Sequence, residues 1–187
     1  MVMIGLETEN IYTESTAKNI IELTEALKEV PFVLVDEVKS LATLENVSNR
    51  EWGLTSEGFL DPIPDSPAAW TQLKKDIAQN EMISGSLVSE DGTLTVIAAP
   101  LDDGFIGGEV YDALLVIKND FATAGKIHIT GAPILVEDVQ RGISGDSRRF
   151  LPIAIVLIFL GFFLCFRTLA GVLLPITMVL MLSLIHI

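Results

Sequence analysis

Two long stretches without Asp, Glu, Lys or Arg end the chain, and they constrain its fold more strongly than any other feature. One covers residues 150–166, and the other covers residues 169–187, where only His186 can carry a charge. At about 1.5 Å of helix rise per residue, the first stretch approaches the hydrocarbon thickness of a bilayer. We therefore expect two transmembrane helices joined by a turn at 167–168, with both outer ends on one side.

The alternative is a buried helical hairpin in a soluble protein. Residues 1–149 would then have to cover two apolar helices on all sides, so the membrane interpretation is favoured. Pro152 falls in the first turn of the first expected span, where a missing N–H costs little. Pro175 falls inside the second span, where we expect a kink or a functional break.

The charge distribution divides the chain at the same point. Residues 1–149 contain 11 Lys and Arg and 25 Asp and Glu, a net charge of −14, whereas Arg167 is the only such residue in 150–187. A domain this acidic repels phosphates, which argues against nonspecific nucleic-acid binding. The single cysteine, Cys165, excludes an intrachain disulfide framework and a cysteine metal cluster.

Hydrophobic periodicity predicts the elements of the acidic domain. Apolar residues spaced by three and four after Thr13 indicate a helix that ends before Pro31, with Thr13 as its N-cap. The full expected order is a strand at 2–6, this helix, a strand at 32–38, a polar connector at 45–66, a helix from Pro67 through Ile77, a hairpin with arms at 85–89 and 93–99, a helix at 110–121 and a strand at 126–130.

Two β-α-β-type units joined by a long connector predict an α+β fold, with an antiparallel sheet and two helices on one face. This is the ferredoxin-like, split β-α-β plan. We expect the domain to cover residues 1–132, with 45–80 as an insert containing a short helix, and 133–149 to form a linking helix. Gly142 and Gly145 weaken that helix, so we expect a break before the membrane and a hinge there.

The basic residues near the expected spans leave the orientation open. Arg148 and Arg149 flank the domain end and Arg167 flanks the turn, so the positive-inside count weakly favours a cytoplasmic domain. Long domains cross a membrane largely regardless of charge, and Arg148 and Arg149 equally suit anchors at the headgroups.

No group of residues predicts catalysis, a cofactor site or a metal site. His128 lies between two strand isoleucines, and an exposed histidine explains it without a catalytic partner. Asp102 and Asp103 precede Gly104 and are explained by a solvated turn. The glycines that follow lack the Lys-Ser/Thr of a phosphate loop, and no histidine base accompanies the serines. Packing is the simplest role for the aromatic residues Trp52, Phe59 and Trp70.

Several short segments of the chain carry a family resemblance. In chain order they are ENIYT at 9–13, LVSEDGTLT at 87–95, IHITGAP at 127–133, and FRT at 166–168 followed by GVLLP at 171–175. Together they resemble the RND (resistance-nodulation-division) superfamily, specifically its hydrophobe-exporter and MMPL-type permeases. Within that family they are similar to the opening of a porter subdomain, its hairpin, its return to the membrane, and the turn between the second and third spans.

The resemblance implies a porter domain with the second and part of the third span of an exporter. Ion-driven helix movement would export hydrophobic or amphiphilic substrates such as lipids or drugs. Residues 1–149 would lie outside the cytoplasmic membrane, and Arg167 on its cytoplasmic side, in a multi-pass protein of the cell (inner) membrane. The implied partners are the lipid bilayer, the substrates and the rest of the transporter chain, with a homo-oligomer left open; no enzyme activity or cofactor is implied.

Part of the family pattern is absent from this sequence. No Asp or Glu follows Asp146, so no proton-relay carboxylate can be assigned, and neither a span nor a signal peptide precedes the domain. We therefore expect a fragment truncated at both ends, whose residues 182–187 resemble a translated adapter from DNA library preparation. Two alternatives stay open: a membrane-anchored extracytoplasmic ligand sensor, and a noncatalytic partner-binding subunit of a membrane complex.

Overall fold

A computed structural model of the chain describes residues 1–50, 53–80 and 82–186. It divides the chain into two compact units, Met1–Asp138 and Val139–Ile187. The first unit contains both strands and helices, whereas the elements of the second unit are all helical. The α+β class expected from the sequence is confirmed.

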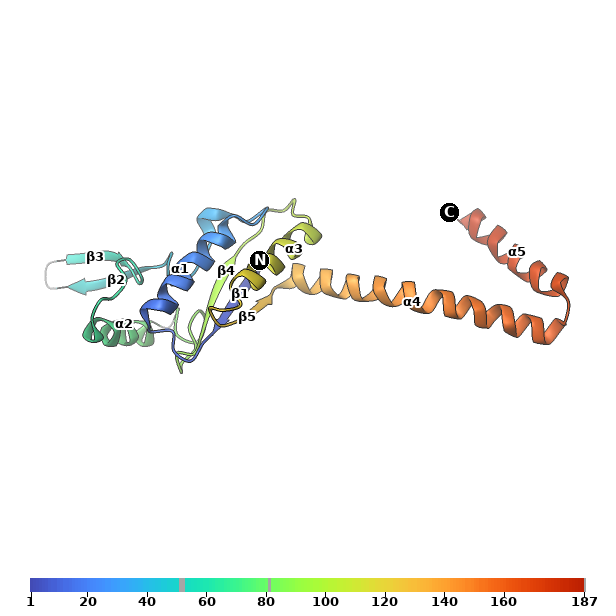
Figure 1. Ribbon diagram of the computed structural model, residues 1–187. Coiled ribbons are helices and arrows are strands. Elements are labelled where there is room, and N and C mark those ends of the chain that lie inside the picture. The colour runs from blue at the N-terminus through green and yellow to red at the C-terminus, as the bar shows by residue number, and fades with distance from the viewer. Residues whose placement is uncertain (51–52, 81, 187) are drawn as a thin grey trace. The chain divides into compact units, whose positions relative to one another are not determined.

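An antiparallel sheet of three strands lies at the centre of the first unit (Figure 1). The central strand β1 (Val2–Glu7) pairs with β4 (Leu94–Ala99) on one side and with β5 (Lys126–Thr130) on the other. Because β4 and β5 are consecutive and enclose β1, the sheet has the split β-α-β arrangement. Alternate residues of β1, namely Val2, Ile4 and Leu6, are fully buried on one face.

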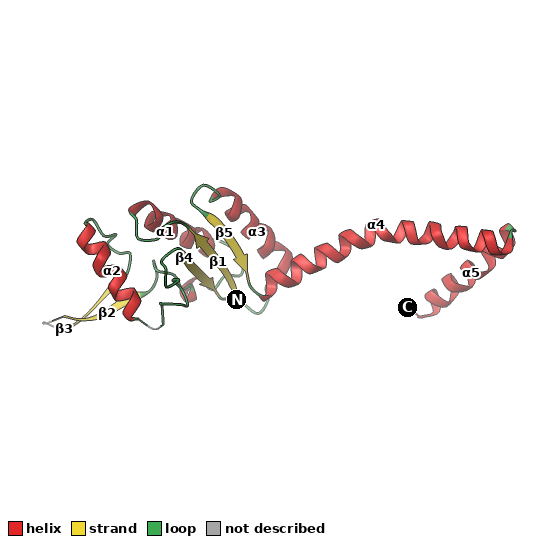
Figure 2. Ribbon diagram, turned by 90° about the horizontal axis from the view of Figure 1, so that it is seen from below, coloured by secondary structure: helices red, strands yellow, loops and turns green. Residues whose placement is uncertain are grey.

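Two helices cover this buried face, as the sequence predicts (Figure 2). They are α1 (Glu14–Lys28), which contacts β4, and α3 (Gly107–Asp120), which contacts β5. The predicted N-cap of α1 is confirmed, because the Thr13 hydroxyl accepts a hydrogen bond of 3.3 Å from the backbone N–H of Thr16. The buried stripe of α1 includes Ile20, Leu23 and Leu27, so its hydrophobic period is the one that the sequence shows.

The insert between α1 and β4 contains more structure than its composition predicts. Where we expected only a polar connector with turns, β2 (Glu45–Arg50) and β3 (Gly53–Gly58) form an antiparallel hairpin. The sequence of β2, ENVSNR, contains one aliphatic residue and therefore gives no alternating signal. The helix expected from Pro67 is confirmed as α2 (Pro67–Gln79), which buries Leu73 and Ile77.

The strand expected at 32–38 is wrong. Phe32 has a φ of 67°, which turns the chain out of the extended conformation, and Val35–Glu37 form a single 3₁₀ turn. Isolated bridges join this part of the chain to β4 and the residues just after it: Val33 pairs with Leu101, beyond the end of β4, and Lys39 pairs with Ala98. The fourth strand of a complete ferredoxin-like sheet is thus reduced to two points of contact.

The hairpin expected at 85–99 is half correct. Its second arm is β4, and its turn contains Gly92 at a φ of 71°, as the Asp-Gly pair predicts. The first arm is not a strand, because the backbone N–H groups of Leu87 and Val88 donate to the Ile83 carbonyl in a local turn. Only Val88 forms a ladder-type bridge to β4, opposite Thr95.

Helix α4 (Ala132–Phe166) begins directly after β5 and continues without interruption through Gly142 and Gly145. The expected break in the helix before the membrane is therefore absent. Pro152 lies inside this helix, so its expected place in a first helical turn is wrong, because the helix begins twenty residues earlier. Arg167, with a φ of 52°, and Thr168 separate α4 from α5 (Leu169–His186), which contains Pro175.

Candidate functional site

Gly131 allows the chain to pass from β5 into α4 directly against β1. Its φ is 131°, and a Cβ at this position would lie 2.6 Å from the Met1 carbonyl oxygen and 3.0 Å from the Val2 Cα. Both neighbours are backbone atoms, so a side chain has no room unless the sheet moves. The start of α4 is consequently fixed to the central strand by a residue that only glycine can provide.

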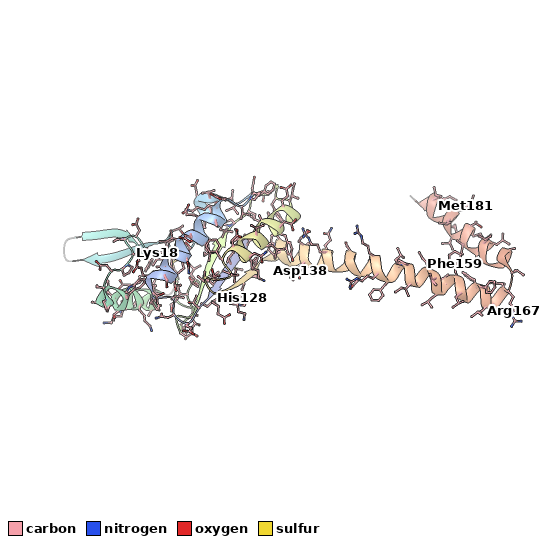
Figure 3. All side chains as sticks on the ribbon, viewed as in Figure 1. Lys18, His128, Asp138, Phe159, Arg167 and Met181 are labelled. Atoms are coloured by element: carbon pink, nitrogen blue, oxygen red, sulfur yellow. The ribbon has the colours of Figure 1, made fainter. Side chains whose placement is uncertain are left out.

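The first two turns of α4 are held against α3. Pro133 and Ile134 are buried, and the Tyr111 hydroxyl of α3 donates a hydrogen bond of 3.0 Å to Asp138 Oδ1 of α4. Asp138 is labelled at the beginning of α4 in Figure 3. This hydrogen bond joins residues 27 positions apart in the sequence, and it connects α4 to α3.

A cavity of about 220 Å³ lies beside this hydrogen bond. Its walls come from α3, the end of β5 and the first turns of α4. Most of its side chains are aliphatic, namely Leu115, Ile129, Ile134 and Leu135, and its polar end is formed by Tyr111 and Asp138. The cavity therefore combines an apolar surface with a single carboxylate.

The C-terminal part of α4 presents large apolar side chains on all its sides. From Leu151 to Phe166 these side chains are exposed, except for the partly buried Phe162; Phe159 is labelled in Figure 3. Within the described residues, α4 is one helix long and apolar enough to cross a membrane by length and composition. The apolar stretch Leu173–Leu182 of α5 is shorter, so a second span at 169–187 stays a prediction.

The residues predicted to act at the membrane lie along α4, the turn and α5. Arg148 and Arg149 are exposed on α4, Arg167 is exposed in the turn, and Pro175 is inside α5. A Cβ added at Gly142 or Gly145 would meet no heavy atom within 4 Å. The anchoring and hinge roles of these residues stay predictions.

The acidic and histidine residues weighed from the sequence occupy exposed positions. His128 is exposed on β5, and its Nε2 lies 2.7 Å from Glu7 Oε2, while Lys126 Nζ lies 3.5 Å from the same oxygen. The His128 hydrogen bond, followed by the charge of Lys126, lowers the pKa of Glu7 below its ordinary value. Asp102 and Asp103 form the expected solvated turn, in which the Asp103 N–H donates to Asp102 Oδ1 at 2.8 Å.

The described residues contain no group of three or more His, Cys, Asp or Glu side chains that could hold a metal ion. Of the three aromatic residues, Phe59 is buried and Trp70 packs against the core, whereas Trp52 lies outside the described residues. Packing therefore accounts for the two aromatic residues that the structure describes.

Sequence reasoning missed the contact between Tyr111 and Asp138 and the cavity beside it. Tyr111 follows Val110 of the buried α3 stripe, and nothing in the local spacing connects it with a residue on the next helix. The one available signal was the combination of a strand, a glycine and a helix-starting proline at 126–133, which fixes where α4 begins.

Comparison with known proteins adds one finding to this geometry. A sequence model of the MMPL family matches residues 1–186, which is almost the whole chain. No curated protein matches the chain.

Proposed function

The chain belongs to the MMPL family of RND-type membrane transporters, and on this premise we infer that residues 1–132 act as a porter domain moved by α4. The family is one of membrane transporters. It also favours transport over the two alternatives of a ligand sensor and a noncatalytic membrane subunit.

The unbroken course of α4 is the observation that carries this proposal. One helix of 35 residues contains both the buried anchor at Ile134 and the apolar stretch after Arg149. Because one helix joins the two, movement of its apolar part reaches the domain directly, and its weakest points, Gly142 and Gly145, are where we expect it to bend as it does so. Gly131 and the hydrogen bond from Tyr111 to Asp138 secure its first turns to the sheet and to α3.

In the proposed mechanism an ion gradient moves the membrane helices, and residues 133–149 transfer that movement to the porter domain. Residues 1–149 are extracytoplasmic, Arg148 and Arg149 interact with lipid headgroups, and Arg167 turns the chain on the cytoplasmic side of a multi-pass protein of the cell membrane. Hydrophobic or amphiphilic molecules are exported along surfaces that the rest of the transporter, or a second copy of it, completes.

Gly142 and Gly145 give this mechanism a test, because they are the flexible points of the link. Replacing both with Ala raises the helix propensity by about 1 kcal/mol at each position, and no neighbouring atom opposes the new methyl groups. If the link bends during transport, the double variant of the full-length transporter exports a fluorescent amphiphile several times more slowly, at unchanged membrane abundance.

The matched control is Gly161→Ala, another glycine inside α4 with open space around its Cβ position but outside the link. It should leave export unchanged. Unchanged export in the double variant, or an equal loss in the control, would refute the hinge at 142 and 145.

A further inference from the structure

We propose that the cavity between α3, the end of β5 and the first turns of α4 binds a single-chain cationic amphiphile. Its ammonium group pairs with Asp138, and its alkyl chain lies on Leu115, Ile134 and Leu135. This proposal names the class of substrate for the proposed function. Any role of the site in export rests on that proposed function.

The apolar wall of the cavity supports an alkyl ligand. Ile134 forms a buried floor at 8% exposure, while Leu115 and Leu135 are exposed to 36% and 66%. Covering such exposed aliphatic surface is favourable by about 25 cal/mol per Å². An alkyl chain on this surface removes the two leucines from water without any rearrangement of the sheet.

The polar end of the cavity selects a cation. Asp138 Oδ1 accepts the hydrogen bond from Tyr111, which orients the carboxylate and leaves Oδ2 to receive an ammonium group. Neither lysine nor arginine occurs among the described residues that line the cavity. An anionic headgroup would instead meet the charge of this carboxylate.

The charge of the whole domain acts in the same direction. Residues 1–149 carry a net charge of −14, so the long-range field attracts cations and repels fatty acids and phosphorylated lipids. Charge complementarity therefore extends from the single carboxylate to the surface around it.

The size of the cavity limits the ligand to one short chain. The cavity measures about 220 Å³. Pockets that enclose a whole drug-sized ligand are larger, at about 300–1,000 Å³. A single alkyl chain, rather than a whole drug-sized molecule, therefore suits the smaller space.

The test uses the whole chain reconstituted in lipid nanodiscs, with octylammonium as the probe and labelled Leu and Ile methyl groups as the readout. Binding shifts the methyl signals of Leu115, Ile134 and Leu135 in a saturable way. Octyl sulfate, which has the same chain and the opposite charge, gives no saturable shift of these three signals.

Two variants separate the two halves of the site. Asp138→Asn weakens octylammonium binding by about two- to fivefold, since the carboxylate is exposed and the pair is screened. Asp146→Asn, the same change on an exposed residue of the same helix, leaves the affinity unchanged. Leu135→Ser weakens binding through the alkyl chain and, because Leu135 is mostly exposed, leaves the fold intact.

The proposal is overturned if octylammonium produces no saturable shift, if octyl sulfate binds equally well, or if Asp138→Asn binds like the unchanged chain. These outcomes are distinct from failure of the proposed function. Saturable binding with no effect of the double glycine variant on export would retain the site and refute the hinge. No saturable binding with slower export in that variant would refute the site and retain the hinge.

Discussion

Helix α1 and the C-terminal part of α4 use similar aliphatic residues, but they present them in opposite ways. In α1 the aliphatic side chains form one stripe, and Ile20, Leu23 and Leu27 are completely buried against the sheet. In α4 beyond Arg149 they surround the helix, and the side chains of Leu151, Leu157 and Leu164 are all more than half exposed. Protein covers the apolar stripe of α1, whereas an apolar surface on all sides, as in α4, is typical of a helix surrounded by lipid.

This difference shows what a helix-forming sequence leaves undecided. Propensity and periodicity determine that both segments are helical, but the distribution of charge determines what surrounds them. Glu14, Lys18 and Glu22 keep the outer face of α1 polar, and Lys18 Nζ forms an ion pair of 2.7 Å with Glu14 Oε1. No comparable residue occurs in α4 between Phe150 and Phe166.

The most direct way to break this comparison is to remove the same side chain from both helices. Leu23→Ala leaves a cavity under a fully buried residue and should lower the free energy of unfolding of the sheet by about 2–5 kcal/mol. Leu157→Ala, at a residue that is 61% exposed, should change it by less than about 0.5 kcal/mol. Hydrogen exchange of the β1 amides in nanodiscs measures both values.

Equal losses from the two leucine variants would mean that the domain core continues along α4. The apolar part of α4 would then be a protein-covered helix, contrary to the membrane interpretation.

A second comparison sets the closely packed junction against an open turn. Gly131→Ala should lower the same free energy of unfolding by about 1–3 kcal/mol, because a non-glycine residue is strained at this φ and its Cβ would collide with the Met1 carbonyl. Gly104→Ala is the control, since its Cβ would meet nothing within 4 Å. A harmless Gly131→Ala would show that the start of α4 is not fixed to β1.

Hydrophobic patterning predicts the parts of the fold in which burial is periodic. It identified α1, α2, α3 and β5, because each has an apolar face opposite a polar one, and it identified β1 as a short, continuous apolar run. It failed at 32–38, where β-branched residues suggested a strand but Phe32 adopts a positive φ that only the tertiary context imposes. It also failed at β2 and β3, which pair through their backbones with little aliphatic content.

The candidate site was less predictable than the fold, for the same reason. Leu115 and Leu135 are ordinary aliphatic residues on separate helices, and only the tertiary fold places them around one cavity with Asp138. The continuity of α4 was also missed, because two glycines cost about 1 kcal/mol each in a helix. In a helix of 35 residues, propagation from both sides opposes that cost.

The smallest expected effect concerns Glu7, on the exposed face of the sheet. Its lowered pKa means that the contact with His128 stabilises the fold at pH values above the ordinary glutamate pKa, and that this contribution is lost as the pH falls through the lowered value. His128→Ala should return the Glu7 pKa toward its ordinary value, and Lys126→Met should move it less, because the hydrogen bond is the larger cause. A carboxyl NMR titration measures both shifts.

All three side chains are exposed to solvent, so added salt should weaken the contribution of Lys126 to the lowered Glu7 pKa. A Glu7 pKa that stays unchanged in His128→Ala would show that the contact at 2.7 Å is not maintained in solution.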